Sequence, residues 1–166
     1  MSNACAHKLL TEADYLEFEE SAVSRHELVG GEAHGMAGAS ERHNRISGNI
    51  FFHLRAATRG KTCRAFMADM KLRLAQGTLF YYPDVMLVCD PADDHPQFKQ
   101  APCLVAEVLS PATAKVDQRE KLQSDQAIPG LRYYLLVDSE RLWVKVYFLD
   151  ESGTWFDQVI NAEFQC

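Results

Sequence analysis

Two stretches of the chain are apolar almost throughout, which is typical of strands buried on both faces. They are YYPDVMLVC at residues 81–89 and PCLVAEVLSP at residues 102–111. Two further stretches, at residues 142–149 and 154–160, alternate between apolar and polar positions. This alternation predicts an antiparallel hairpin whose turn is the sequence DESG.

Shorter strands are expected in the first half of the chain. The sequence HELVGGEAHGMAG predicts two strands around Gly30 and Gly31, because paired glycines favour a tight hairpin turn. Residues 63–74 and residues 79–88 each have the composition of one strand, with Gly77 between them.

Three stretches have helical patterns. Thr11 is the expected N-cap of the first, with Asp14 at the spacing of a capping box. Ser40 is the expected cap of the second, which should end at Gly60. The third spans residues 113–127, after the most hydrophobic strand. This order predicts an α/β or α+β fold with a mixed sheet flanked by helices.

The length and composition bound the class of protein. A chain of 166 residues fits a single domain, residues 1–166, with a full core. Its apolar runs are too short to span a membrane, and we expect no signal peptide. The five cysteines form no C-x-x-C pair, which predicts reduced thiols in a cytoplasmic protein. Cys89 and Cys103 are expected to fill the core.

The formal net charge of −6 disfavours a general nucleic-acid binder, but the charge is unevenly distributed. The segment from residue 42 to residue 64 contains no acid and six basic side chains: Arg42, Arg45, Arg55, Arg59, Lys61 and Arg64. This segment could present a positive face to a polyanion, or it could be an ordinary solvated helix surface.

Asp84 and Glu107 are carboxylates in otherwise apolar strands. Burying a carboxylate costs several kcal/mol unless it is paired or binds a cation. One such acid could simply reach water at the end of a strand. Two acids in successive strands can lie side by side if the strands are neighbours. Such a pair suits Mg²⁺ or Mn²⁺, which prefer oxygen ligands.

Lys121 follows these acids on the predicted third helix. Its ammonium could orient a water molecule or offset charge that develops at such a metal site. Alternatively, Lys121 pairs with Asp117, which stands four residues before it on the same helix face.

The motifs PDVMLV, EVLSP, DQREKL and IPGLRYYLLVD resemble the Uma-two family. So does HELVGGEAHGMAGASERH, which is similar to that family's N-terminal block ending in S-x-x-H. Members of the family are described as restriction-type endonucleases of the PD-(D/E)xK superfamily. The resemblance covers about residues 11–147 and implies a restriction-endonuclease-like core.

The resemblance also implies roles for individual residues. Asp84 matches the aspartate of the PD motif, and Glu107 matches the second acid. Leu109 occupies the place where many relatives carry their lysine, and Lys121 on the following helix takes its role. Glu27 would be a further acid at the metal.

His43 matches the histidine of the N-terminal block, where it would contact nucleic acid or be an ordinary surface residue. The chain departs from the family pattern at Asp125 and Tyr133 and ends early, which bears on the surface for substrate or a second copy.

Two functions from different classes follow. The first is a Mg²⁺-dependent endonuclease that hydrolyses DNA, with Asp84, Glu107 and Glu27 at the metal and Lys121 at the water. The basic segment and His43 would contact the DNA backbone, and the enzyme would act as a homodimer. The second is a catalytically silent module that keeps the fold for binding or assembly. A serine hydrolase using Ser110 is disfavoured, because no nucleophile elbow surrounds it.

Overall fold

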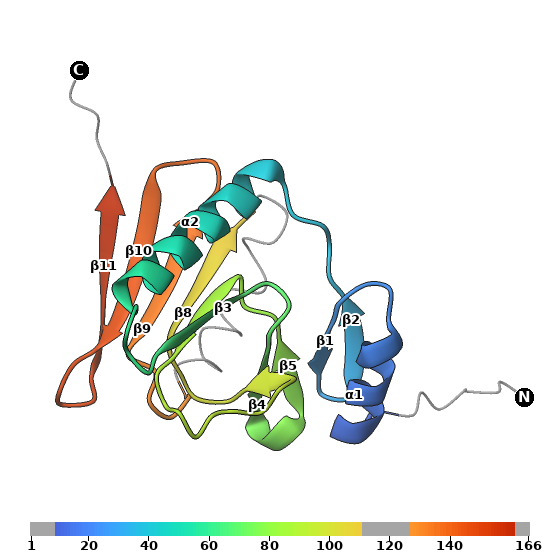
Figure 1. The fold of residues 1–166 in the computed structure, drawn as a ribbon. Helices are drawn as coiled ribbons and strands as arrows, with labels where there is room; N and C mark the ends of the chain where they lie inside the picture. The colour runs from blue at the N-terminus through green and yellow to red at the C-terminus, as the bar shows by residue number, and fades with distance from the viewer. Residues whose placement is uncertain (1–8, 111–126, 162–166) are drawn as a thin grey trace, which may run out of the picture.

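The computed structural model describes residues 9–110 and 127–161, which form two β-sheets and two α-helices (Figure 1). The predicted third helix, with Asp117, Lys121 and Asp125, lies outside the described residues. No helix within the described part of the chain is long and apolar enough to cross a bilayer. The prediction of a mixed α and β fold is confirmed.

The larger sheet has six strands in the order β11-β10-β9-β8-β6-β3. Only β8 and β9 run parallel within it, so the sheet is mixed. Its strands are β3 (Arg64–Met67), β6 (Val85–Val88), β8 (Pro102–Leu109), β9 (Tyr133–Asp138), β10 (Trp143–Leu149) and β11 (Trp155–Asn161). Strands β10 and β11 form the hairpin that the alternating pattern predicts.

The smaller sheet has five strands in the order β2-β1-β5-β4-β7. Its strands are β1 (His26–Val29), β2 (Glu32–Gly35), β4 (Lys71–Leu74), β5 (Leu79–Tyr81) and β7 (Phe98–Lys99), with the short 3-10 helix η1 (Ala75–Gly77) between β4 and β5. Gly30 and Gly31 both have positive φ and form the predicted turn between β1 and β2. Glycine adopts this conformation at little cost, which explains the pair.

The two helices begin where their capping residues predict. Helix α1 (Glu12–Ser21) has a complete capping box between Thr11 and Asp14. Helix α2 (Glu41–Ala57) begins at Ser40, whose hydroxyl accepts a hydrogen bond from the His43 backbone. Helix α2 ends at Ala57, three residues before Gly60.

Two sequence expectations are corrected, because two predicted strands each divide between the two sheets. Residues 63–74 form β3 in the large sheet and β4 in the small one, with Ala68 at φ 55° in the turn. Residues 79–88 form β5 in the small sheet and β6 in the large one. The two crossings are joined by a hydrogen bond of 3.2 Å from Ala68 N to Asp84 O.

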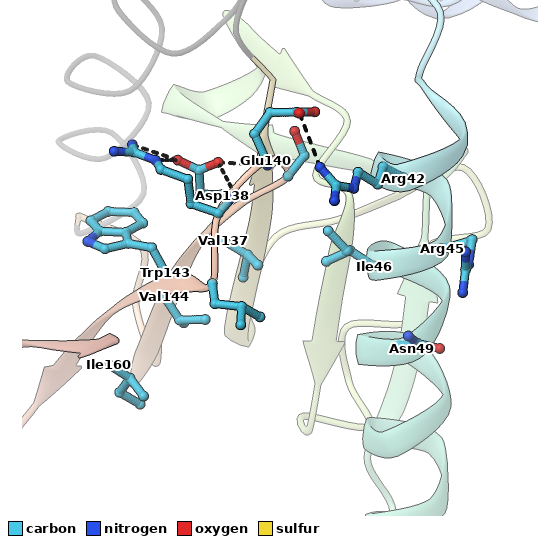
Figure 2. Close-up of a pocket in the computed structure, with 13 residues that line it drawn as sticks. Arg42, Arg45, Ile46, Asn49, Val137, Asp138, Glu140, Trp143, Val144 and Ile160 are labelled. Atoms are coloured by element: carbon cyan, nitrogen blue, oxygen red, sulfur yellow. Dashed lines mark hydrogen bonds and ion pairs between the residues drawn. The ribbon is translucent and has the colours of Figure 1, made fainter. Parts of the chain in front are cut away.

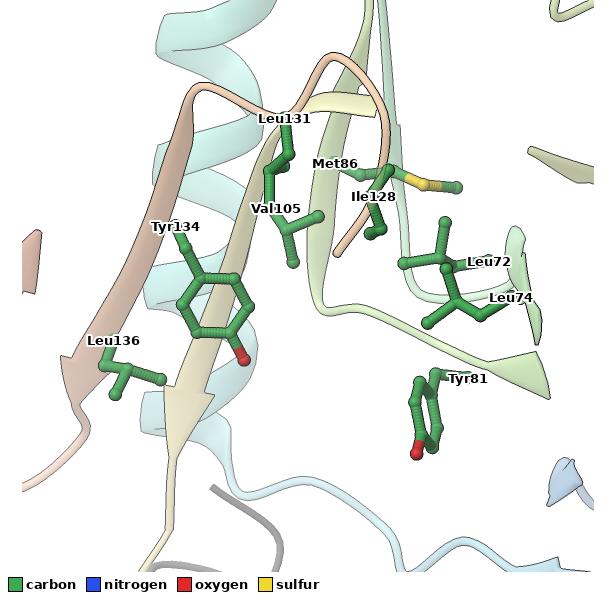
Figure 3. Packing of buried hydrophobic residues seen from close by; sticks show 9 residues of the cluster. All are labelled: Leu72, Leu74, Tyr81, Met86, Val105, Ile128, Leu131, Tyr134 and Leu136. Atoms are coloured by element: carbon green, nitrogen blue, oxygen red, sulfur yellow. The ribbon is translucent and has the colours of Figure 1, made fainter. Parts of the chain in front are cut away.

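The main core lies between the two sheets (Figure 3). Side chains from β4, β5, β6, β8 and β9 meet there, together with Ile128 and Leu131 of the following connection. A second cluster packs α1 against the small sheet through Tyr15, Leu28 and Phe80. Helix α2 crosses the other face of the large sheet (Figure 1). Each sheet is therefore covered by a helix on the face that turns away from the other sheet.

The cysteines depart from expectation. Cys63 and Cys89 are joined by a disulfide, so the prediction of reduced thiols is wrong for this pair. Cys89 and Cys103 are also only partly buried. The cysteine composition failed as a guide because the two strand ends meet in the fold although they are far apart in sequence. The cysteine composition therefore no longer supports a cytoplasmic location. That location stays a prediction.

Candidate active site

Asp84 lies at the junction of the two sheets, in the crossing between β5 and β6. The expectation that it stands within a strand is therefore corrected: it precedes β6 by one residue. Its Oδ2 accepts a hydrogen bond of 2.7 Å from Val108 N in β8. The side chain is 22% exposed, so the carboxylate is half-buried and open to solvent on one side.

Glu107 meets Asp84 across neighbouring strands. Strands β6 and β8 pair antiparallel, with Val85 opposite Ala106. Glu107 Oε2 accepts a long hydrogen bond of 3.4 Å from Asp84 N. The Val108 amide of β8 thus donates to Asp84, and the Asp84 amide donates to Glu107, so backbone hydrogen bonds link the two acids.

Glu27 approaches from the small sheet. It lies in β1, and its Oε1 accepts a hydrogen bond of 3.4 Å from Tyr82 N. Tyr82 stands two residues before Asp84 in the crossing segment. The three acids therefore come from three segments in two sheets, and the crossing at residues 82–84 connects them.

His43 also reaches this junction. It lies in the first turn of α2, where its Nε2 is 3.2 Å from Asp84 Oδ2. Its side chain is only 16% exposed. The sequence had suggested a nucleic-acid contact or a surface position, and contact with Asp84 was missed. One sequence feature could have helped to locate His43: Ser40 caps the helix, and this makes His43 the third residue of the helix.

A buried hydrogen-bond network around Glu19 adjoins the junction. Glu19 of α1 accepts hydrogen bonds from the Tyr82 hydroxyl at 2.9 Å and from His26 N at 3.0 Å. Its second oxygen is 3.2 Å from His26 Nδ1. Tyr15 donates its hydroxyl to His26 O at 2.6 Å. Burial raises the pKa of Tyr82 and of Tyr15, so both phenols stay protonated and can donate.

Glu19 was not singled out from the sequence. It sits on a helix rich in exposed acids and has no local feature that distinguishes it from Glu17 or Glu20. Only the fold shows that it is 1% exposed.

The donor set fits a hard divalent cation by its chemistry. Asp84, just before β6, and Glu107 in the adjacent strand β8 supply carboxylate oxygens, and Mg²⁺ needs only one or two carboxylates because it retains several waters. Within the described residues, no group of three or more His, Cys, Asp and Glu side chains has the geometry of a complete metal site.

The basic residues lie along α2 and the connection that follows it. Arg45, Arg55, Arg59 and Lys61 are exposed. Arg42 pairs with Glu140 at 3.1 Å. Arg64 instead turns inward and donates to the backbone oxygens of Asp90 and Asp93. Helix α2 thus links the candidate site at its first turn to a basic surface farther along.

A pocket of about 450 Å³ lies beside the site rather than in it (Figure 2). It opens between α2 and the turn from β9 to β10. Ile46, Val137, Val144 and Ile160 provide its apolar wall, and Arg42 and Glu140 close one end through their ion pair. None of Asp84, Glu107, Glu27 and His43 lines it.

Two proteins of Synechocystis sp., both called uncharacterized (sll1609 and slr1290), are 37% and 33% identical to this chain over 134 and 147 residues. These alignments cover 79% and 88% of this chain and 76% and 77% of the relatives.

A crystal structure from Anabaena variabilis, titled a "putative nuclease belonging to DUF820", superposes with a TM-score of 0.74 at 16% identity. The match covers 92% of this chain and 85% of that one, and it shows a shared fold. A family model named Uma2, described as "Putative restriction endonuclease", matches residues 12–165. The sequence motifs, the fold and this match together establish that the chain belongs to the Uma2 family.

Proposed function

We propose that this protein is a divalent-metal-dependent endonuclease that hydrolyses phosphodiester bonds of DNA. The observation that carries the proposal is the pair of hydrogen bonds that links Asp84, just before β6, with the Glu107 segment of the neighbouring strand β8 at a half-buried junction. Family membership supports the same function.

Asp84 and Glu107 would hold Mg²⁺ or Mn²⁺, with Glu27 as a ligand to its water shell. The cation would supply Lewis acidity and a more acidic bound water. Hydrolysis forms one P–O bond to the attacking water oxygen and breaks the P–O bond to the leaving sugar oxygen. The protein must orient that water, accept its proton and hold the phosphate in place.

His43 would fix the orientation of Asp84. A hydrogen bond from Nε2 to Asp84 Oδ2 would hold the carboxylate in one rotamer, as the Val108 amide does from the other strand. Lys121, outside the described residues, is proposed from the family motif to offset charge on the scissile phosphate. His43 is thus proposed as a positioning residue rather than as a contact to DNA.

The exposed basic residues of α2 and its connection are proposed to contact the DNA backbone. Arg45, Arg55, Arg59 and Lys61 follow the helix that begins at the acids, and Arg42 could exchange its ion pair with Glu140 for a phosphate. Such contacts position the duplex without reading its sequence.

The first experiment is calorimetric titration with Mn²⁺, which needs no assumption about the DNA sequence. We expect binding to the wild type and its loss in Asp84→Asn and in Glu107→Gln. Asp157→Asn is the matched control, because Asp157 is a half-exposed acid of β11 that pairs with Lys145. Equal Mn²⁺ binding by all four proteins would refute the metal site.

A cleavage assay on supercoiled and linear DNA then separates the endonuclease from the silent module. An endonuclease should nick or cut the DNA with Mg²⁺, and Glu107→Gln and Lys121→Ala should abolish this cutting. Metal binding and DNA binding without any cutting would favour the module.

We also propose that two copies pair through β11. This strand is an edge of the large sheet and carries the exposed apolar side chains Phe156, Val159 and Ile160. An exposed apolar edge strand is a ready template for pairing with another chain. Sedimentation velocity should give a dimer for the wild type and a monomer for Ile160→Lys, and a monomeric wild type would contradict the pairing.

A further inference from the structure

Three cysteines meet at the end of the large sheet that is remote from Asp84. Cys63 precedes β3, Cys89 follows β6, and Cys103 lies in β8. Four residues of extended chain lie between Asp84 and Cys89, so the Cα atoms of these two residues are roughly 16 Å apart. The cluster is therefore independent of the proposed nuclease site.

The third sulfur touches the disulfide. Cys63 and Cys89 are bonded, and Cys103 Sγ lies 2.8 Å from Cys89 Sγ. The β6–β8 register shifts between Leu87 and Val88, which brings Cys103 beside Cys89. All three cysteines are only partly buried, so solvent and small reagents can reach them.

We propose that this cluster is a thiol–disulfide exchange site, with Cys103 as the attacking thiol. Cys103 loses its proton, and its thiolate attacks Cys89 Sγ. A Cys89–Cys103 bond forms, and the Cys63–Cys89 bond breaks. Cys63 leaves as a thiolate and takes up a proton. Cys103 is oxidised and Cys63 is reduced, so the step needs no external oxidant.

The exchange would change which strands are covalently joined. The Cys63–Cys89 bond ties the edge strand β3 to β6, whereas a Cys89–Cys103 bond would tie β6 to β8. Strand β3 would then be held by its hydrogen bonds and packing alone. The connection between α2 and β3 would lose its anchor at the same time.

The environment of Cys103 sets the conditions for the reaction. Burial raises the pKa of the Cys103 thiol, so little thiolate is present near neutral pH and exchange should accelerate as the pH rises. In the sequence, Arg64 follows Cys63 and Asp90 follows Cys89. The Cys103 thiol donates to Leu87 O, and the backbone amide of Arg132 donates to Cys103 O.

Disulfide mapping tests the proposal in full-length protein with Cys5→Ser and Cys166→Ser, which leaves the three clustered cysteines. The protein is equilibrated with glutathione and glutathione disulfide, freed of both, and incubated at about pH 7 or about pH 9. Free thiols are then blocked with N-ethylmaleimide, and peptides are identified by mass spectrometry. Adding Cys103→Ser removes the attacking thiol, and adding Cys63→Ser instead removes the leaving group.

We expect N-ethylmaleimide on both Cys103 and Cys63, with Cys63 labelling appearing faster at the higher pH. Cys103→Ser should abolish the labelling of Cys63, and Cys63→Ser should yield the Cys89–Cys103 disulfide. Labelling confined to Cys103 at every time and pH would overturn the proposal. So would the absence of any disulfide among the three after the glutathione step, or Cys63 labelling that persists in Cys103→Ser.

Discussion

At the scale of single residues, Glu19 connects the two segments that carry the acids. Its carboxylate is 1% exposed and accepts hydrogen bonds from Tyr82 and from His26. Tyr82 stands two residues before Asp84, and His26 stands one residue before Glu27. A buried carboxylate is stable only when its oxygens are satisfied, so these donors and Glu19 depend on one another.

Tyr82→Phe tests this dependence. We expect the free energy of unfolding to fall by about 1–3 kcal/mol, because the change leaves a buried carboxylate oxygen short of a donor. Chemical denaturation measures the loss. Tyr133→Phe is the control, since Tyr133 is half-exposed at the start of β9 and should change stability little. Equal stability of the two variants would contradict the importance of the Tyr82 hydroxyl.

The ion pair of Glu12 with Arg73 predicts a pH dependence. Two hydrogen bonds of 2.7 and 2.8 Å join them, and they lower the pKa of the Glu12 carboxyl below its ordinary value. A folded-state pKa below the unfolded one adds stability above the unfolded pKa, and this stability is lost as the pH falls through the folded pKa.

We therefore expect Glu12→Gln to lower the melting temperature near neutral pH, and we expect this difference from the wild type to shrink as the pH falls below about 4 and through the lowered folded-state pKa of Glu12. Thermal melts from neutral to acid pH measure the difference between variant and wild type. Asp69→Asn is the control, because Asp69 is largely exposed in its pair with Arg25 and should have little effect. A constant difference across the pH range would contradict the assignment.

At the scale of elements, the turn between β4 and β5 is shaped to receive helix α1. Gly77 ends η1 with φ at +89°, and a Cβ there would collide with the Glu12 carboxylate. Arg73 in β4 holds that carboxylate. The small sheet therefore contacts α1 at Gly77, where a larger side chain would collide with Glu12.

Gly77→Ala should destabilise the protein by about 2–5 kcal/mol, because backbone strain adds to the displaced ion pair. Gly153→Ala is the matched control: Gly153 has φ +81°, with no atom within 4 Å of an added Cβ. It should cost only about 1–2 kcal/mol for the backbone conformation. Denaturant titration of both variants measures the difference, and equal losses would show that contact with Glu12 does not matter.

At the scale of the whole molecule, exposed arginines lie along helix α2 and the connection after it, in a protein of net charge −6. The acids of the candidate site and the N-terminus of α2 meet at one end of the helix, while Arg55 and Arg59 lie near the other. Affinity for DNA should therefore come mainly from arginine and lysine side chains that neutralise phosphates, and it should fall as the salt concentration rises.

The double variant Arg55→Gln/Arg59→Gln should reduce the slope of log affinity against log salt by about 2, because each arginine would neutralise one phosphate in the wild type. Fluorescence anisotropy with labelled duplex DNA at several salt concentrations measures this slope. Arg132→Gln, an exposed arginine that precedes β9, should leave it unchanged. A slope that is equal in all three proteins would place the DNA elsewhere.

Local signals in the sequence determined the helix starts and the hairpins. Thr11 and Ser40 satisfy backbone groups within one turn, and Gly30–Gly31 sets a turn within two residues. These interactions join residues that are close together in the sequence, so the sequence pattern alone predicts them.

Only the tertiary structure decided where two apolar runs change sheets. The sequence of each run is equally compatible with one continuous strand. That crossing places Asp84 beside Glu107 and within reach of His43, and it brings Tyr82 to both Glu27 and Glu19. The pairing of β3 with β6 brings Cys63 against Cys89. Such contacts join residues 20 or more positions apart, and their energy depends on packing between sheets, which no short sequence pattern encodes.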